Sequence, residues 1–144
     1  MLGHEFPHIL RNSTAKATGI FNNNPGFQQN LINEEPPTIH LKLLSTNEPF
    51  SLRTLLLPAN IGRVSDSRTR PSARNGLFNS RFLSRHHAVI KWEGERVVVE
   101  DLGSCNGTFV NGVAVKSGEN WPLAEGDILQ FGSDDDNAES KCVF

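Results

Sequence analysis

The chain has 144 residues and a formal net charge of −2, with 14 Lys and Arg against 16 Asp and Glu. This near balance excludes a protein that coats polyanions through its overall charge, and the length is that of about one domain. No apolar run is long enough to span a membrane, and no signal peptide is visible. Cys105 and Cys142 are too few for a disulfide framework, so we expect a cytoplasmic or nuclear protein.

Residues 1–37 are expected to form a disordered polar tail. They contain clusters of breaker residues such as Asn22-Asn23-Asn24-Pro25-Gly26, and neither a strand period nor a helix period persists across them. The predicted folded domain covers residues 38–144. Because the chain stops within an apolar run at Phe144, we expect it to be a fragment of a longer protein.

Short β-type runs separated by turn residues begin at Thr38. Ile39, Leu41 and Leu43 alternate with polar neighbours, as in a half-buried strand. Further strands are predicted at 52–57, 87–92, 97–100, 108–110, 113–115, 128–131 and 141–144. Asn111-Gly112 is a strong hairpin signal, whereas 68–79 is expected to be a mobile loop. The pattern predicts an all-β sandwich.

Charge is strongly segregated along the chain. Seven Lys and Arg but one acid, Asp66, lie between Arg63 and Lys91, whereas seven acids and no Lys or Arg lie between Glu119 and Glu139. This pattern predicts a local anion site and a separate solvated acidic rim. The alternative is that the arginines only decorate exposed loops.

Three motifs fall at predicted strand ends. Ile61-Gly62-Arg63 follows a strand and opens a long loop, and Ser84-Arg85-His86-His87 immediately precedes a strand. The segment 103–108 joins two strands. Because the end loops of a sandwich meet at one edge, we expect these three motifs to converge there.

In this order and spacing, the motifs Gly62-Arg63, Ser84-x-x-His87, Asn106-Gly107 and Asn111-Gly112 resemble the forkhead-associated (FHA) domain, a phosphothreonine-binding β-sandwich. The resemblance covers residues 38–144 and implies two antiparallel or mixed sheets of about 11 short strands. Within the family, the segment 82–88 looks most like the sarcolemmal membrane-associated protein (SLMAP) group and its fungal counterparts. FHA domains of Dma-type ubiquitin ligases also have a long loop before this segment.

The resemblance implies that Arg63, Ser84 and Arg85 hold a phosphate while Asn106 holds the peptide backbone. Physical chemistry agrees, because a phosphate carries about −1.5 to −2 charge at neutral pH. Arginine presents a planar fork of donors to its oxygens. The asparagine amide can both donate to and accept from an extended main chain.

Cys105 departs from the family pattern, which usually has Ser or Thr at this phosphate-binding position. A thiol is a poor donor, so we expect weaker binding, with the backbone N–H of Cys105 still available. Backbone N–H groups around Ser104-Cys105-Asn106 are predicted to form a small anion-binding concavity.

Four residues are expected to support the site without touching the ligand. Gly62 is interpreted as a turn glycine, and His87 is expected to pin the Ser84 loop by hydrogen bonding. Gly107 and Asn111 are assigned to turn chemistry. Arg74 and Arg81 are expected to make outer contacts to the bound partner.

The leading hypothesis is a binding module without catalysis, cofactor, metal or nucleic acid. The resemblance implies a scaffold of a striatin-interacting phosphatase and kinase (STRIPAK) complex that recruits phosphorylated partners. Its C-terminal membrane tail, absent here, would place it on the cytosolic face of the endoplasmic reticulum or nuclear envelope. A Dma-type host and a phosphate-independent interaction domain are the alternatives.

Two other functions are disfavoured. An enzyme using Cys105 with His86 or His87 needs an orienting group and an oxyanion hole. Nucleic-acid binding needs more aromatic rings in the basic segment than Phe78 and Phe82. Asp134-Asp135-Asp136 lacks the ligand spacing of a calcium loop and is expected to be a solvated turn.

Overall fold

The computed structural model describes residues 36–44, 49–132 and 140–144, and most of the predicted tail lies outside these residues. The described part contains eleven strands and no helix, so the all-β prediction is confirmed. It accordingly contains no helix that is long and apolar enough to cross a membrane.

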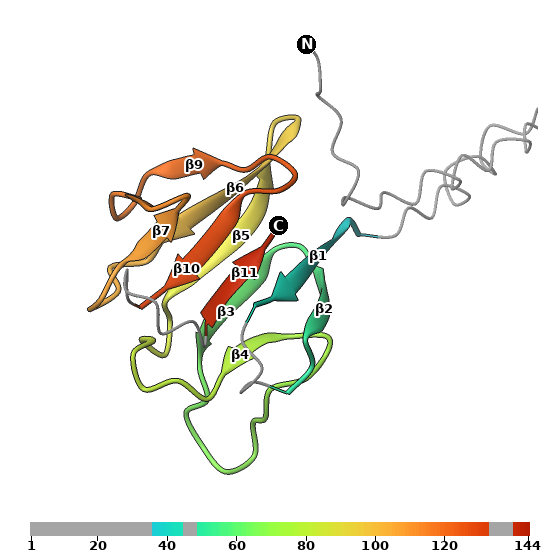
Figure 1. The fold of residues 1–144 in the computed structure, drawn as a ribbon, viewed down its shortest axis with the longest axis vertical. Coiled ribbons are helices and arrows are strands. Elements are labelled where there is room, and N and C mark those ends of the chain that lie inside the picture. Colours follow the sequence, from blue (N-terminus) through green and yellow to red (C-terminus); the bar gives the residue numbers. More distant parts are fainter. Residues whose placement is uncertain (1–35, 45–48, 133–139) are drawn as a thin grey trace, which may run out of the picture.

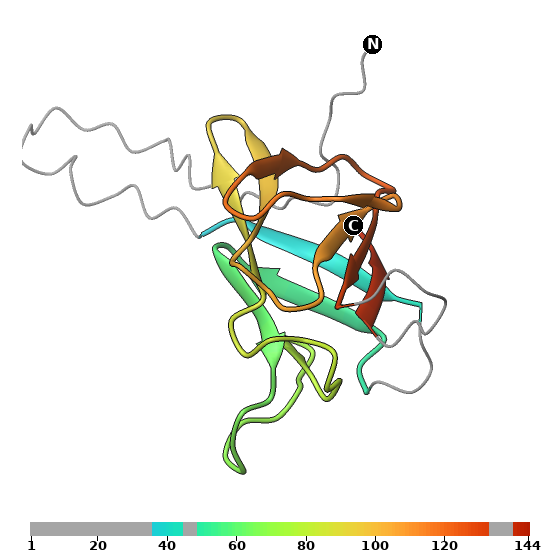
Figure 2. The same ribbon diagram turned by 90° about the vertical axis from the view of Figure 1, so that its left-hand side faces the viewer.

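The strands form two sheets that pack face to face (Figures 1 and 2). The six-stranded sheet has the order β2 (Leu52–Leu56), β1 (Thr38–Leu43), β11 (Lys141–Val143), β10 (Ile128–Phe131), β7 (Thr108–Val110), β8 (Val113–Ala114). The five-stranded sheet has the order β4 (Gly76–Phe78), β3 (Ala59–Arg63), β5 (Ala88–Glu93), β6 (Arg96–Asp101), β9 (Asn120–Pro122). Among the strands of the described residues, only the β3–β4 pair is parallel, so the predicted combination of antiparallel and mixed sheets is confirmed.

The core lies between the sheets and follows the alternation of the sequence. Ile39 and Leu41 of β1 are buried, and Leu55 of β2 is paired with Ile39 on the same face. Ile61 and Ile90 face them from the other sheet in the same buried cluster. Because successive side chains of a strand point to opposite faces, one face of each sheet packs into this core and the other face points outwards.

Two predictions about the region before the site are wrong. Ile61-Gly62-Arg63 does not follow a strand but forms the end of β3, and the predicted long loop begins directly after Arg63. The expected loop 68–79 contains β4, whose three residues pair with Ile61–Arg63. A three-residue strand with a glycine and one outward leucine has too short a pattern to be predicted from alternation.

Arg53 crosses the sandwich from one sheet to the other. Its side chain is fully buried, and its Nη1 donates to the carbonyls of Asn75 and Leu77. Its guanidinium lies over the Phe78 ring, 4.5 Å from the centroid. Arg53 of β2 therefore holds β4, which in turn pairs with the strand that carries Arg63.

Arg53→Ala is expected to lower the free energy of unfolding by about 3 kcal/mol, because it leaves a cavity and two carbonyls without their donor. A urea titration followed by tryptophan fluorescence measures this change. The matched control is Arg96→Ala on the exposed start of β6, for which we expect a change within about 0.5 kcal/mol. Equal midpoints for both variants would contradict the role of Arg53.

Candidate functional site

The three predicted motifs converge at one edge of the sandwich. The backbone N–H of Arg63 donates to the carbonyl of Ser84 at 3.0 Å. The backbone N–H of Cys105 donates to Ser84 Oγ at 3.0 Å, and Asn106 Nδ2 donates to the carbonyl of Phe82 at 2.9 Å. Hydrogen bonds thus join the end of β3, the β4–β5 connection and the β6–β7 connection, as predicted.

Gly62 is required by a close approach and not by a turn, which corrects its interpretation. It lies within β3, and a Cβ added to it would stand 1.9 Å from the carbonyl oxygen of Arg85. Any side chain at this position would push the Ser84-Arg85 segment away from the strand. The missing side chain therefore sets the distance between Arg63 and Arg85.

Arg63 and Arg85 line one pocket of about 500 Å³. The rest of its polar wall consists of Asn60, Ser65, Thr69 and His86, and no Asp or Glu among the described residues lines it. Within the described part of the chain, Arg63 Nε is buried and has no hydrogen-bond partner. Because two arginines and no described acid line the pocket, it favours an anionic ligand.

The backbone N–H groups that were predicted to cradle an anion are instead used within the protein. The N–H of Cys105 donates to Ser84 Oγ, and the N–H of Ser104 donates to Asp101 Oδ2 at 3.0 Å. The prediction of an anion-binding concavity at these two groups is wrong. Because Ser84 Oγ accepts from Cys105, its own O–H proton remains to be donated to a ligand.

His87 holds the Ser84 segment, as predicted. The buried ring accepts a hydrogen bond at Nδ1 from the Ser84 N–H at 3.0 Å and donates from Nε2 to the Gly107 carbonyl at 2.8 Å. These partners fix the neutral tautomer. Burial lowers the pKa of His87 below its ordinary 6.5, although the Gly107 carbonyl and Asp101 act in the opposite direction.

Asp101 organises the β6–β7 connection and was missed by the sequence analysis. Its carboxylate accepts from the backbone N–H groups of Gly103 and Ser104 and from the hydroxyls of Ser104 and Thr108. Burial alone would raise the pKa of Asp101, but these hydrogen bonds hold it below its ordinary 3.8. An Asp two residues before a Gly-Ser pair, as in Asp101-Leu102-Gly103-Ser104, is a turn pattern that could have identified this role.

The remaining supporting residues adopt turn conformations. Gly107 has a φ of 93° and its carbonyl also accepts from Gly132. Asn111 and Gly112 have φ values of 51° and 82°, which confirms the predicted turn. The Asn111 side chain also accepts from the Ile128 N–H at 2.9 Å and so ties the turn to β10.

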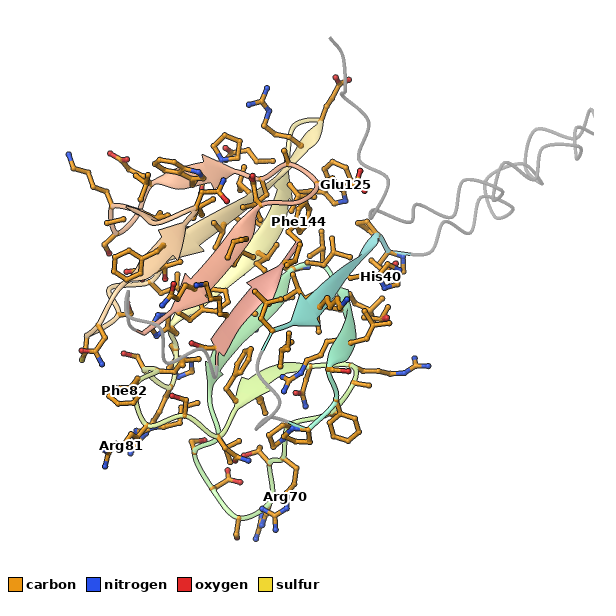
Figure 3. The ribbon with its side chains drawn as sticks, viewed as in Figure 1. His40, Arg70, Arg81, Phe82, Glu125 and Phe144 are labelled. Atoms are coloured by element: carbon orange, nitrogen blue, oxygen red, sulfur yellow. The ribbon has the colours of Figure 1, made fainter. Side chains whose placement is uncertain are left out.

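The two predicted outer contacts lie away from the Arg63 pocket. The Arg81 guanidinium lies 5.4 Å from the Phe82 ring centroid, and Arg74 lines a neighbouring pocket. Figure 3 shows Arg70 and Arg81 at one end of the domain and Glu125 towards the other, in keeping with the charge segregation. Asp134-Asp135-Asp136 lies outside the described residues.

A two-sheet sandwich with a basic pocket where its end loops meet defines a small binding domain. The family model for the FHA domain matches residues 60–132. The chain therefore belongs to the FHA domain family.

Relatives of known sequence come from several kinds of protein. Human sarcolemmal membrane-associated protein is 38% identical over 61% of this chain and 12% of its own length. The probable E3 ubiquitin-protein ligase dma1 of Schizosaccharomyces pombe is 35% identical over 54% of this chain and 31% of its own length. Vacuolar protein sorting-associated protein 64 of Saccharomyces cerevisiae is 42% identical over 44% of this chain and 11% of its own. The chain thus spans a third or less of these relatives.

A solved structure supports the fold. Full-length yeast Pml1p superposes with a TM-score of 0.59 at 20% identity, over 74% of this chain and 79% of that one.

The stability of the domain is expected to fall when the pH is lowered from 7.5 to 5.5. Because the folded pKa of His87 lies below 6.5, the unfolded chain binds the proton first. The contribution of His87 is therefore complete above about pH 6.5 and is lost as the pH falls towards the folded pKa. Urea midpoints across this range measure the loss.

His87→Gln should remove most of this pH dependence while lowering stability at pH 7.5. The matched control is His86→Gln, at the exposed neighbouring position, which should retain the pH dependence of stability. A wild-type midpoint that does not change with pH would contradict the assignment.

Proposed function

We propose that the domain binds a phosphothreonine-containing segment of a partner protein. The observation that carries the proposal is the pocket that Arg63 and Arg85 share, which no described Asp or Glu lines. The buried Arg63 Nε also lacks a hydrogen-bond partner in the described part of the chain. A phosphate would supply the missing acceptor and compensate both positive charges. The preference for threonine over serine is that of the family.

Each residue has a distinct role in this proposal. Arg63 and Arg85 bind phosphate oxygens, and the Ser84 hydroxyl donates to a third oxygen while its own oxygen is held by Cys105 N–H. Asn106 is tethered through Nδ2 to the Phe82 carbonyl. Its Oδ1 is therefore oriented to accept from the main chain of an extended peptide.

The proposed activity is binding without catalysis. A nucleophilic Cys105 would need a histidine base, but both ring nitrogens of His87 are committed to Ser84 and Gly107. His87 is also buried whereas Cys105 is exposed. No cofactor has a role in this proposal.

For the whole protein, we propose a STRIPAK-type scaffold of the cytoplasm that recruits phosphorylated partners. The 38% identity to human SLMAP supports this proposal. The similarity to dma1, at 35%, keeps a ubiquitin-ligase host as the second candidate. The full-length sequence distinguishes the two candidates. Coiled coils after the FHA domain would favour the scaffold, and a catalytic domain after it would favour the ubiquitin ligase.

Phosphothreonine peptides should bind the wild-type chain, while matched phosphoserine and unphosphorylated peptides should bind weakly or not at all. Arg63→Ala should weaken binding by about 2–5 kcal/mol, because it removes one partner of a desolvated charge pair. Arg63→Lys should restore only part of this loss, since an ammonium lacks the planar fork. Isothermal titration calorimetry measures each affinity.

Arg96→Ala is the control, because this arginine lies at the exposed β5–β6 turn. If Arg63→Ala left partner binding unchanged, recognition of a phosphate at this site would be excluded. A phosphate-independent interaction surface would then be favoured.

Cys105→Ser is expected to strengthen phosphothreonine binding by about 0.5–1.5 kcal/mol, because a hydroxyl donates better than a thiol. The backbone N–H at this position already serves Ser84, so the gain would come from the side chain alone. The same titration on Cys105→Ala is the control, and equal affinities for the two variants would show that the position does not touch the phosphate.

A further inference from the structure

A second pocket of about 280 Å³ lies beside the proposed phosphate pocket. It occupies the corner where β2 ends and where β3 and β4 begin. Leu56, Pro58 and Leu77 form apolar parts of its wall, and Arg74 lines it as well. Leu56 is 58% exposed, so the pocket presents apolar surface that the fold does not cover.

The two pockets adjoin each other, because Asn60 of β3 and Leu77 of β4 line both. Arg63 and Arg85 lie at one end of the resulting groove, and Leu56 and Arg74 lie at the other. No Asp or Glu in the described part of the chain lines either pocket. We define this surface as the β3–β4 groove.

We propose that the β3–β4 groove binds the segment adjoining the phosphothreonine of the same partner, with a large apolar side chain in the second pocket and an acidic residue beside Arg74. The proposal rests on the proposed function, because the phosphate anchors the segment at Arg63. The acid-free lining favours an acidic segment, and the exposed Leu56 favours an apolar anchor.

The spacing of the anchor follows from strand geometry. From Arg63 to Ala59, β3 advances by about 13 Å, which an extended peptide also covers in about four residues. The apolar residue should therefore stand about four residues from the phosphothreonine, on one side only.

The partner is held by its side chains and not by adding a strand to the sheet. β4 is the edge strand (Figure 1), but the Leu77 N–H donates to Asn75 Oδ1 at 3.1 Å and its carbonyl accepts from Arg53. These bonds occupy the Leu77 groups that a docking strand would need.

The first experiment screens the 144-residue chain against a phosphothreonine peptide library that is random on both sides of the phosphothreonine. We expect enrichment of Leu, Ile or Phe about four residues away on one side, with Asp or Glu next to it. A peptide that includes this residue should bind about tenfold tighter than one truncated before it, which corresponds to about 1.4 kcal/mol.

Leu56→Asp tests the groove and Leu52→Asp is its matched control. Both leucines lie on β2 and are similarly exposed, at 58% and 57%, but Leu52 lines neither pocket. Leu56→Asp should reduce binding of the long peptide to that of the short one and leave the short peptide unaffected. Leu52→Asp should change the affinity of neither the long nor the short peptide. Arg74→Glu should abolish the preference for the acidic residue of the peptide.

The outcomes separate the two proposals. The groove is excluded and the proposed function stands in either of two cases. In the first, short phosphothreonine peptides bind and the long peptide binds no tighter. In the second, Leu56→Asp and Leu52→Asp weaken binding of the long peptide equally. If the folded chain binds no phosphothreonine peptide, the proposed function is excluded and the groove proposal with it.

Discussion

The buried His87 ring is the contact on which the binding edge depends. Its two nitrogens join the Ser84 N–H to the Gly107 carbonyl, two groups that belong to different connections, β4–β5 within one sheet and β6–β7 between the two sheets. Because the ring packs edge-on against Phe131 of the opposite sheet, its position is set by the core. A loop contact that would otherwise be free to vary is therefore fixed from inside the sandwich, which lowers the cost of ordering the site on binding.

The rest of the site is held by contacts of the same kind, made by residues that touch no ligand. Gly62 lets the Arg85 carbonyl approach β3, and Arg53 holds β4 beside that strand. Asp101 gathers four donors and so shapes the connection that carries Cys105 and Asn106. The proposed ligand-binding groups occupy only the surface of this arrangement, so their geometry depends on buried polar groups that must all be satisfied.

Sequence patterns predicted the parts of this structure that local chemistry determines. The alternation of apolar and polar residues located β1. The Asn111-Gly112 dipeptide predicted a hairpin turn, and both residues have the positive φ that such a turn requires. Contacts between distant segments could not be predicted in the same way. Arg53 stands in a run of leucines where nothing local shows that it faces inwards, and the use of Cys105 N–H by Ser84 depends on two loops 21 residues apart. Long-range pairing, and not local propensity, decides both.

A phosphate site alone cannot distinguish one phosphothreonine protein from another, since each would present the same group to the proposed phosphate contact at Arg63. Discrimination needs contacts that differ between partners, and these must lie within reach of the phosphate. The charge distribution meets this need in part, because it concentrates arginines around the site while a net charge of −2 limits general attraction to polyanions. In the proposed β3–β4 groove, the apolar corner beside Leu56 would add what charge cannot supply, namely a preference for the shape of a side chain at a defined distance from the phosphate.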